Sequence, residues 1–221
     1  MPGMDMSAMQ MSGFYEWRWS AVMLLFLMWA VMMIAMMVPS AVPMIQAFLA
    51  VNERRRNSSG QLVSVGFFLL GYVVIWTWFS AAAALGQWGL HKAALLSPAM
   101  VATSPVVSGG LLLAAGVFQW TPLKRACLRG CRSPLSFLMS EWRDGAAGAF
   151  SMGLRHGAYC VGCCWALMAL LFVVGVMNLL WVAVIALFVM AEKILPRGEL
   201  LGYIGGAALV TAGAAVMAKA W

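Results

Sequence analysis

The chain has 221 residues, of which 64% are hydrophobic and 10% are charged, and its formal net charge is +7. Water-soluble domains are about half apolar and about a quarter charged, so this composition excludes an ordinary soluble domain and indicates a polytopic membrane protein. The positive charge is expected to favour the anionic headgroups of a lipid bilayer over nucleic acid, since the sequence contains no nucleic-acid-binding motif.

The first residues, 1–18, are predicted to form a methionine-rich outer tail that precedes a single transmembrane helical domain at residues 19–221. Nothing in this tail resembles a basic secretory signal with a cleavage site. Thioether sulfur can collect Cu(I) in an oxidising compartment where thiols would be lost. Outer metal capture is therefore one interpretation, and a disordered tail without a ligand is the other. The thioethers concerned are those of Met4, Met6, Met9 and Met11.

Six apolar segments are candidates for membrane-spanning helices, each of which needs about 20 mostly apolar residues. We therefore expect an all-α fold, a transmembrane bundle of about six helices. Five helices is the alternative, because the short fifth segment could form a helical hairpin with the fourth, turning at Met177–Asn178. The segments cover residues 19–49, 62–85, 105–120, 157–177, 179–191 and 200–218.

The basic residues are distributed unevenly over the predicted loops. Eleven of the 14 lysines and arginines fall between the first and second, third and fourth, or fifth and sixth segments. The positive-inside rule makes that side cytoplasmic, so both termini are predicted to lie outside. The expected location is the cytoplasmic membrane of a bacterium. The other three basic residues are Arg18, Lys92 and Lys219.

The first segment carries a stripe of methionines beside two prolines. On a helical wheel Met33, Met36 and Met37 share one face, together with Met44. Pro39 should kink the helix and free backbone carbonyls for other partners, as should Pro43. These thioethers either fill the core or belong to a metal path.

An amphipathic segment is predicted between the third and fourth helices, within residues 118–138. Basic residues alternate there with leucines, which is typical of a helix that lies in the membrane interface on the cytoplasmic side. A break is expected at Ser133–Pro134. Cys127 and Cys131 lie one helical turn apart in this segment and are either metal ligands or packing residues. Disulfides are not expected on this reducing side.

The fourth segment opens with a run of soft donors, "RHGAYCVGCCWALM" from Arg155. His156, Cys160 and Cys163 lie within about 60° of arc on a helix, with Cys164 beside them. Thiolate and thioether sulfur select Cu(I), and imidazole is an acceptable partner. One helix cannot surround an ion, so a site would need ligands from a second helix. The competing interpretation is that cysteines act here as small packing residues.

Glu192 is a carboxylate near the end of the fifth segment, next to Lys193. An ionisable side chain at that depth is a functional candidate, able to complete a metal shell or to carry a proton. The alternative is a simple ion pair between these two neighbours.

Several unusual blocks occur together in this chain: "WAVMMIAMMVPSAVP", "GYVVIW", "FQWTPLKRACLRGCRSPLSFL", "GAYCVGCCWALM" and "GVMNLLWVAVIALFVMAEK". With them the chain, from about Met23 to Gly213, resembles an uncharacterised bacterial family, a domain of unknown function whose members are predicted metal-binding integral membrane proteins. The resemblance implies a metal-binding role for the Met-Met-Pro and cysteine blocks. The positions concerned are Met36, Met37, Pro39, Cys127, Cys131, Cys160, Cys163 and Cys164.

The leading hypothesis is a membrane protein that binds a soft transition metal, most readily copper, for transport, storage or delivery to a metalloenzyme or a metallochaperone. One alternative is a membrane thiol-redox protein that uses Cys160 and Cys163. Another is a scaffold subunit of a membrane complex, without chemistry of its own. No catalytic residue is predicted, and an enzyme is the less favoured class, because the sequence has no nucleotide-binding loop and no zinc-protease helix.

Overall fold

The computed structural model describes residues 19–59, 65–93, 95 and 102–219. Within these residues the fold is all-α, as predicted, with helices joined by short turns. The proposed capture residues Met4, Met6, Met9 and Met11 lie outside the described residues. The helices are α2 (Trp19–Ser59), α3 (Val65–Lys92), α4 (Pro105–Phe118), α5 (Pro122–Arg132), α6 (Pro134–Glu141), α7 (Gly145–Ala169), α8 (Leu171–Val174), α9 (Leu179–Ile194) and α10 (Gly198–Ala218).

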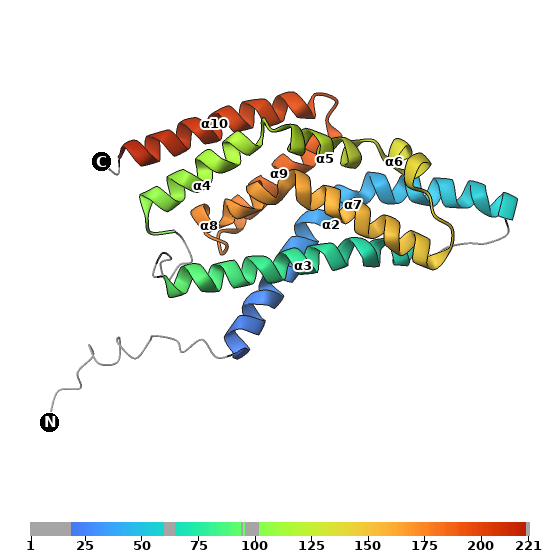
Figure 1. The fold of residues 1–221 in the computed structure, drawn as a ribbon, viewed down its shortest axis with the longest axis horizontal. Coiled ribbons are helices and arrows are strands. Elements are labelled where there is room, and N and C mark those ends of the chain that lie inside the picture. Colours follow the sequence, from blue (N-terminus) through green and yellow to red (C-terminus); the bar gives the residue numbers. More distant parts are fainter. Residues whose placement is uncertain (1–18, 60–64, 94, 96–101, 220–221) are drawn as a thin grey trace.

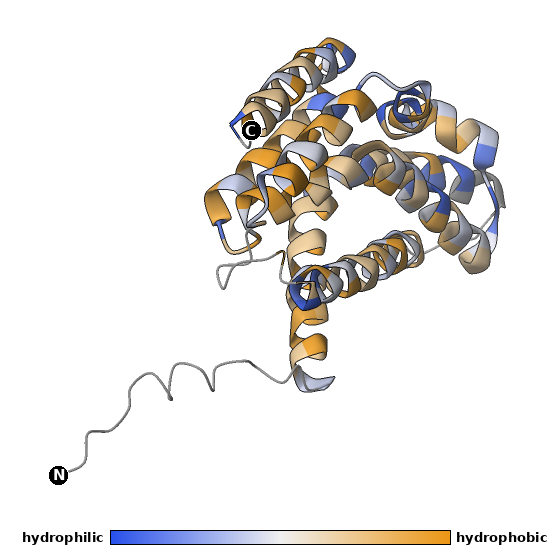
Figure 2. Ribbon diagram, turned by 60° about the vertical axis from the view of Figure 1, so that its left-hand side comes forward, coloured by the Kyte–Doolittle hydropathy of each residue, from blue (hydrophilic) through white to orange (hydrophobic). Residues whose placement is uncertain are grey.

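The chain runs back and forth along the long axis of the molecule (Figure 1). Helices α4 and α10 lie side by side at one edge of the view, and α3 and α7 form a second pair. Helix α2 crosses the bundle, and its N-terminal part projects away from the other helices (Figures 1 and 2). Helix α9 lies between these layers and contacts both α10 and α2, so the interior of the bundle is assembled around α7 and α9.

Four helical stretches are long and apolar enough to cross a membrane: Trp19–Arg55, Val65–Lys92, Gly145–Val174 and Gly198–Ala218. The pair α4 and α5, bent by 64°, would provide a fifth span if both helices form one broken span. Helix α9 has only 16 residues, which is short of the length that a full span requires. Four or five spans are therefore supported within the described residues, and the predicted count of six is not confirmed.

The beginning of α7 corrects the sequence prediction. This helix starts at Gly145 and not at 157, because its first turns are rich in glycine and alanine and pack tightly on α3. A Cβ atom placed on Gly153 would come to 2.0 Å from the carbonyl oxygen of Phe68. Small residues allow such close approach of two helices. Arg155 and His156 consequently lie well inside the helix and not at its entrance.

The two prolines of α2 do not end this helix, which continues for 41 residues. Pro39 and Pro43 are exposed, whereas Ser40 and Met44 face the interior. Figure 1 shows that α2 changes direction along its length, as expected for a helix with proline in its interior. The bend lets one long helix contact both α3 and α9.

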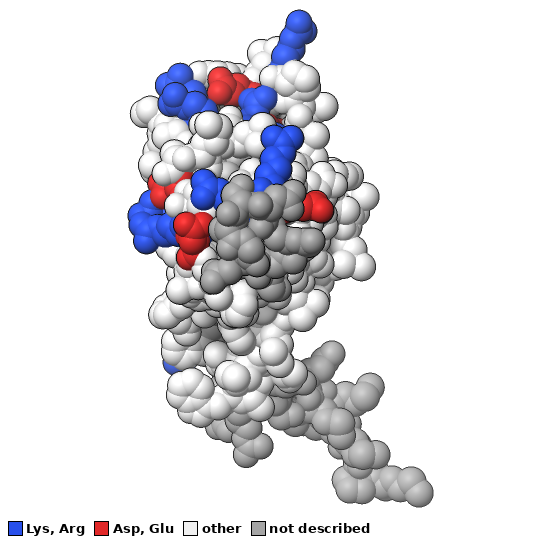
Figure 3. All heavy atoms as spheres, turned by 90° about the vertical axis from the view of Figure 1, so that its right-hand side faces the viewer, with Lys and Arg blue, Asp and Glu red and all other residues white. Residues whose placement is uncertain are grey.

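Charged side chains gather at the end of the molecule where α2 ends and α7 begins, while most of that view is uncharged (Figure 3). Arg55 approaches Asp144 with 3.7 Å between Nη1 and Oδ1. Arg155 forms an ion pair with Glu141 of α6. These contacts attach the α5–α6 segment, which breaks between Arg132 and Pro134 as predicted, to the end of the bundle.

Candidate metal centre

Four cysteine side chains meet in the core of the bundle. Cys160, Cys163 and Cys164 come from α7 and are at most 2% exposed. Cys131 comes from α5, and its side chain contacts the thiols of Cys160 and Cys163. The structure thus brings a thiol of a second helix, α5, to the cysteines of α7.

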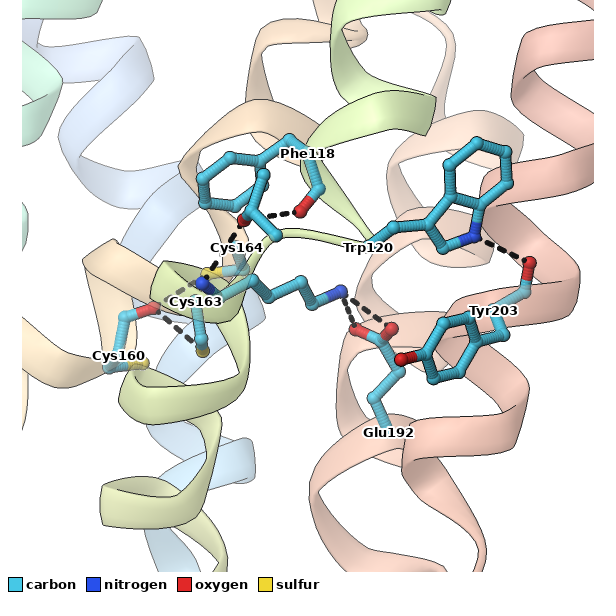
Figure 4. A network of polar contacts seen from close by, with 9 residues as sticks. Phe118, Trp120, Cys160, Cys163, Cys164, Glu192 and Tyr203 are labelled. Atoms are coloured by element: carbon cyan, nitrogen blue, oxygen red, sulfur yellow. Dashed lines mark hydrogen bonds and ion pairs between the residues drawn. The ribbon is translucent and has the colours of Figure 1, made fainter.

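The geometry of α7 explains how the three neighbouring cysteines share one face. Residues three and four positions apart lie next to each other on a helix. The thiols of Cys163 and Cys164 both turn back to the carbonyl oxygen of Cys160, with Sγ–O distances of 3.1 Å and 2.9 Å (Figure 4). The S–H groups are therefore satisfied by backbone as the structure stands.

Cys160 is the centre of the polar contacts. Its Sγ accepts a hydrogen bond from Lys193 Nζ of α9 at 2.9 Å. The hydroxyl of Tyr72, on α3, lies 3.1 Å from the same sulfur. Two other helices, α9 and α3, therefore each place a polar atom against this buried sulfur.

The network continues into α2. Lys193 also donates to Ser40 Oγ at 3.0 Å, and Ser40 donates to the carbonyl oxygen of Met37 at 2.8 Å. Tyr72 donates to the same carbonyl at 3.0 Å. These contacts fix the bent part of α2 against the cysteines and explain why polar side chains are tolerated in an apolar core.

Sequence reasoning missed the roles of Tyr72 and Lys193. A lysine at the end of an apolar segment could have signalled an inward-facing charge, since such residues are rare and face the bundle interior. Because Glu192 is the next residue, an ion pair with it already accounted for the charge of Lys193.

The alternative of a simple ion pair between Glu192 and Lys193 is wrong. Glu192 pairs with Lys124 of α5, with 2.6 Å and 2.9 Å from Nζ to the two carboxylate oxygens, and both side chains are 2% exposed. Successive residues on a helix point about 100° apart, so Glu192 and Lys193 face different neighbours. Figure 4 shows Glu192 away from the three cysteines of α7, and its carboxylate is not part of the sulfur cluster.

The methionines of α2 divide between two clusters. Met33, Met36 and Met37 are buried in the same apolar cluster as the four cysteines. Met44, predicted to share their face, packs instead with Phe48 and Phe68 in a second cluster. Met44 is buried like the other three methionines, as the shared face predicts, and lies about two turns further along the helix than Met37. Thioethers from α2 and thiols from α5 and α7 do meet in one core.

His156 is only 2% exposed and lies in the core of the bundle. Its ring stacks on Phe68 and Tyr72, with centroid distances of 5.9 Å and 5.6 Å, and meets the edge of Phe137 at 5.7 Å. Among the described residues its Nδ1 has no hydrogen-bond partner. This nitrogen is buried and belongs to a residue one helical turn from Cys160. It is therefore available as a further metal ligand.

Cys127 lies at the edge of the cluster and is only half-buried. Its sulfur occupies the space over Gly162, where an added Cβ atom would come within 2.7 Å of it. Of the two cysteines of α5, Cys131 joins the central group and Cys127 packs on the backbone of α7.

The sulfur cluster is not a preformed metal cage. Among the described residues, no three His, Cys, Asp or Glu side chains are arranged to enclose an ion. The thiols contact each other and the Cys160 carbonyl, so holding a metal would require their side chains to rotate. The donor set fits a soft monovalent ion such as Cu(I) by its chemistry, and it lacks the carboxylate oxygens that hard cations prefer.

The fold and the cluster together define an all-α protein with a core of soft sulfur donors. A family model described as "PpoB2: Copper chaperone" matches residues 26–216, and the chain belongs to this family. The expectation of a metal-related family is thereby confirmed, although the family is one described by copper and not the uncharacterised family of the sequence analysis. No curated protein and no solved structure matches the chain significantly.

Proposed function

We propose that this protein is an integral membrane copper chaperone, which holds Cu(I) on buried sulfur and delivers it to a partner. The observation that carries the proposal is the meeting of Cys131 on α5 with Cys160 and Cys163 on α7 in a buried core. A chain of the copper chaperone family that collects thiols from two helices has the ligands that Cu(I) prefers.

Apolar residues on the outer surface support insertion in a bilayer. Leu24, Val31 and Leu179 are each at least 67% exposed, and apolar residues occur along most of the helices (Figure 2). In water such a surface would drive aggregation, whereas in lipid it is the ordinary exterior. The basic end near Arg55 and Arg155 would face the cytoplasm of a bacterium by the positive-inside rule.

Cys160 and Cys163 are the proposed primary ligands, with Cys131 and Cys164 as exchange partners. Met33, Met36 and Met37 would accept the ion from the outer side through thioether sulfur, which binds Cu(I) without carrying charge. His156 would serve as a further donor through its unpartnered Nδ1. Cys127, at the edge of the cluster, offers a thiol nearer the surface. The outer methionines Met4, Met6, Met9 and Met11 would capture copper before it reaches this path.

Delivery of copper to a partner fits this protein better than active pumping of copper across the membrane. The sequence contains no nucleotide-binding loop, and the ligands lie on helices that already contact one another. Transfer by exchange of thiolate ligands needs only a partner with a thiol or thioether of its own. A metalloenzyme or a soluble metallochaperone is the kind of partner that this chemistry fits.

The test is Cu(I) binding by protein purified in detergent without oxygen. Bicinchoninate, a coloured Cu(I) chelator, would compete for the ion with the wild type and with a variant carrying Cys160→Ser, Cys163→Ser and Cys164→Ser. We expect the wild type to remove Cu(I) from the chelator and the triple variant to lose that ability. Cys127→Ser is compared with it, because it removes one thiol from the edge of the cluster and leaves the central thiols in place. Equal copper uptake by the wild type and the triple variant would refute the proposal.

A further inference from the structure

The buried core contains a positive charge without a carboxylate partner. Lys193 is only 8% exposed. The ion pairs among the described residues join Arg55 to Asp144, Lys124 to Glu192 and Arg155 to Glu141, and none includes Lys193. A buried ammonium group is costly unless an opposite charge and hydrogen bonds compensate it.

The contacts of Lys193 point to sulfur as that opposite charge. Its two hydrogen bonds go to Ser40 Oγ and Cys160 Sγ. A hydroxyl group can accept a hydrogen bond but brings no negative charge, whereas a thiolate brings a full one. The neighbouring lysine of the core, Lys124, is already neutralised by Glu192. The thiols are therefore the groups in this core that can balance Lys193.

We propose that Lys193 is the built-in counter-charge of an anionic Cu(I)–thiolate complex and thereby sets the affinity of this site for copper. This inference rests on the proposed function, and it adds a residue that contacts no metal but acts through Cys160.

The charge balance supports this assignment. One Cu(I) ion and two thiolates sum to a net charge of −1, and the ammonium of Lys193 brings the buried total to zero. In an apolar core an unbalanced charge of either sign is strongly unfavourable. The protons of the thiols that bind the ion leave to solvent as Cu(I) enters, and no oxidation or reduction takes place. Lys193 is thus a positioning and charge-balancing residue, not a ligand.

A cycle of two substitutions separates charge balance from a merely structural role. Lys193→Gln removes the positive charge and keeps a polar side chain. Cys163→Met replaces one thiolate by a neutral thioether of similar softness. The complex of Cu(I) with the one remaining thiolate then has no net charge. Cu(I) affinity would be measured for the wild type, both single variants and the double variant by competition with bicinchoninate.

We expect Lys193→Gln alone to bind Cu(I) about 100-fold more weakly than the wild type, as when one partner of a buried charge pair is lost. In the Cys163→Met background the same substitution should cost little, since no net negative charge remains to be balanced. Lys193→Arg, which keeps the charge, should retain most of the affinity. If Lys193→Gln does not fold, Lys193→Leu takes its place in the same cycle.

The control is the pair Lys124→Gln with Glu192→Gln, which removes a buried lysine together with its own carboxylate and should leave Cu(I) affinity unchanged. An equal loss from Lys193→Gln in both backgrounds would assign Lys193 a structural role and overturn the inference. Unchanged affinity of Lys193→Gln in a copper-binding protein would overturn it and leave the proposed function standing. Absence of Cu(I) binding by the wild type would overturn both.

Discussion

Lys193 and Cys160 are 33 positions apart in the sequence and meet in the core, with 2.9 Å between Nζ and Sγ. This contact joins α9, which is too short for an ordinary span, to the helix that carries three of the four clustered cysteines. It places a lysine side chain directly against the sulfur cluster.

Tyr72→Phe removes the hydroxyl group that links Cys160 to the Met37 carbonyl. We expect a loss of about 1–2 kcal/mol in the free energy of unfolding, because the buried carbonyl loses a hydrogen-bond donor while the ring packing stays. Denaturation in detergent, followed by circular dichroism, would measure the loss. Tyr203→Phe is the control, since Tyr203 is exposed and should change stability little. Equal effects of both variants would contradict the importance of the Tyr72 bond.

Removing either member of the Lys124–Glu192 pair should be strongly destabilising. Lys124→Gln or Glu192→Gln leaves a buried charge without its partner, which costs about 3–5 kcal/mol. The double variant removes both charges and should be more stable than either single variant. Thermal unfolding of the four proteins would measure this coupling. Additive losses in the double variant would show that the two side chains act independently.

Gly153→Ala tests the close contact between α3 and α7. The new Cβ atom would lie 2.0 Å from the Phe68 carbonyl oxygen, so the helices must separate, at a cost of about 1–3 kcal/mol. Gly89→Ala is the matched control, because its new Cβ atom would have no atom within 4 Å apart from its chain neighbours and the adjacent backbone of its own helix. Thermal unfolding should show a large drop for the first variant and none for the second. A neutral Gly153→Ala would mean that the helices are not packed at this distance.

Adding a Cβ atom at position 162 should displace the Cys127 side chain and leave the central thiols in place. The Cβ atom of Gly162→Ala would come within 2.7 Å of Cys127 Sγ, so we expect the Cys127 side chain to move outward. Labelling by a small thiol reagent would then become faster at this residue, as read by mass spectrometry of the peptide. Faster labelling of Cys160 instead would indicate that the whole contact between α5 and α7 has opened.

The proposed orientation can be tested from outside the cell. Gly89→Cys introduces a thiol near the exposed end of α3, and Ala146→Cys introduces one near the start of α7. A membrane-impermeant thiol reagent added to spheroplasts should label the first and spare the second, with the wild type as the blank. Lysed cells should show labelling of both. The opposite pattern would reverse the orientation derived from the basic residues.

Much of the architecture could be predicted because lipid imposes a simple rule on long apolar segments. The ends of α4, α9 and α10 lie within a few residues of the predicted segments. The start of α7 was missed because its glycines and alanines are weakly hydrophobic, and only their packing on α3 explains them. A hydropathy pattern reports what faces lipid, not how closely two helices approach.

The candidate metal centre was also predictable only in part from the sequence. The spacing of Cys160, Cys163 and Cys164 predicted a shared face, because a helical wheel depends only on local geometry. Which helix would meet that face, and that Lys193 would turn toward it, depends on tertiary packing. Met44 illustrates the difference, since it is buried as the wheel predicted but packs in another cluster.

Glu192 and Lys193 are adjacent on α9, and each has its own buried partner. These two contacts fix the rotation of α9 about its own axis. Turning α9 by one residue, about 100°, would bring the carboxylate of Glu192 to the sulfurs and carry the ammonium of Lys193 past them. Lys124 would then lose its carboxylate, and a carboxylate would face the thiols in place of an ammonium group. Evolution could exchange many apolar residues along this helix, but the order of these two is dictated by their neighbours, and reversing it would require rebuilding α5 and α7 as well.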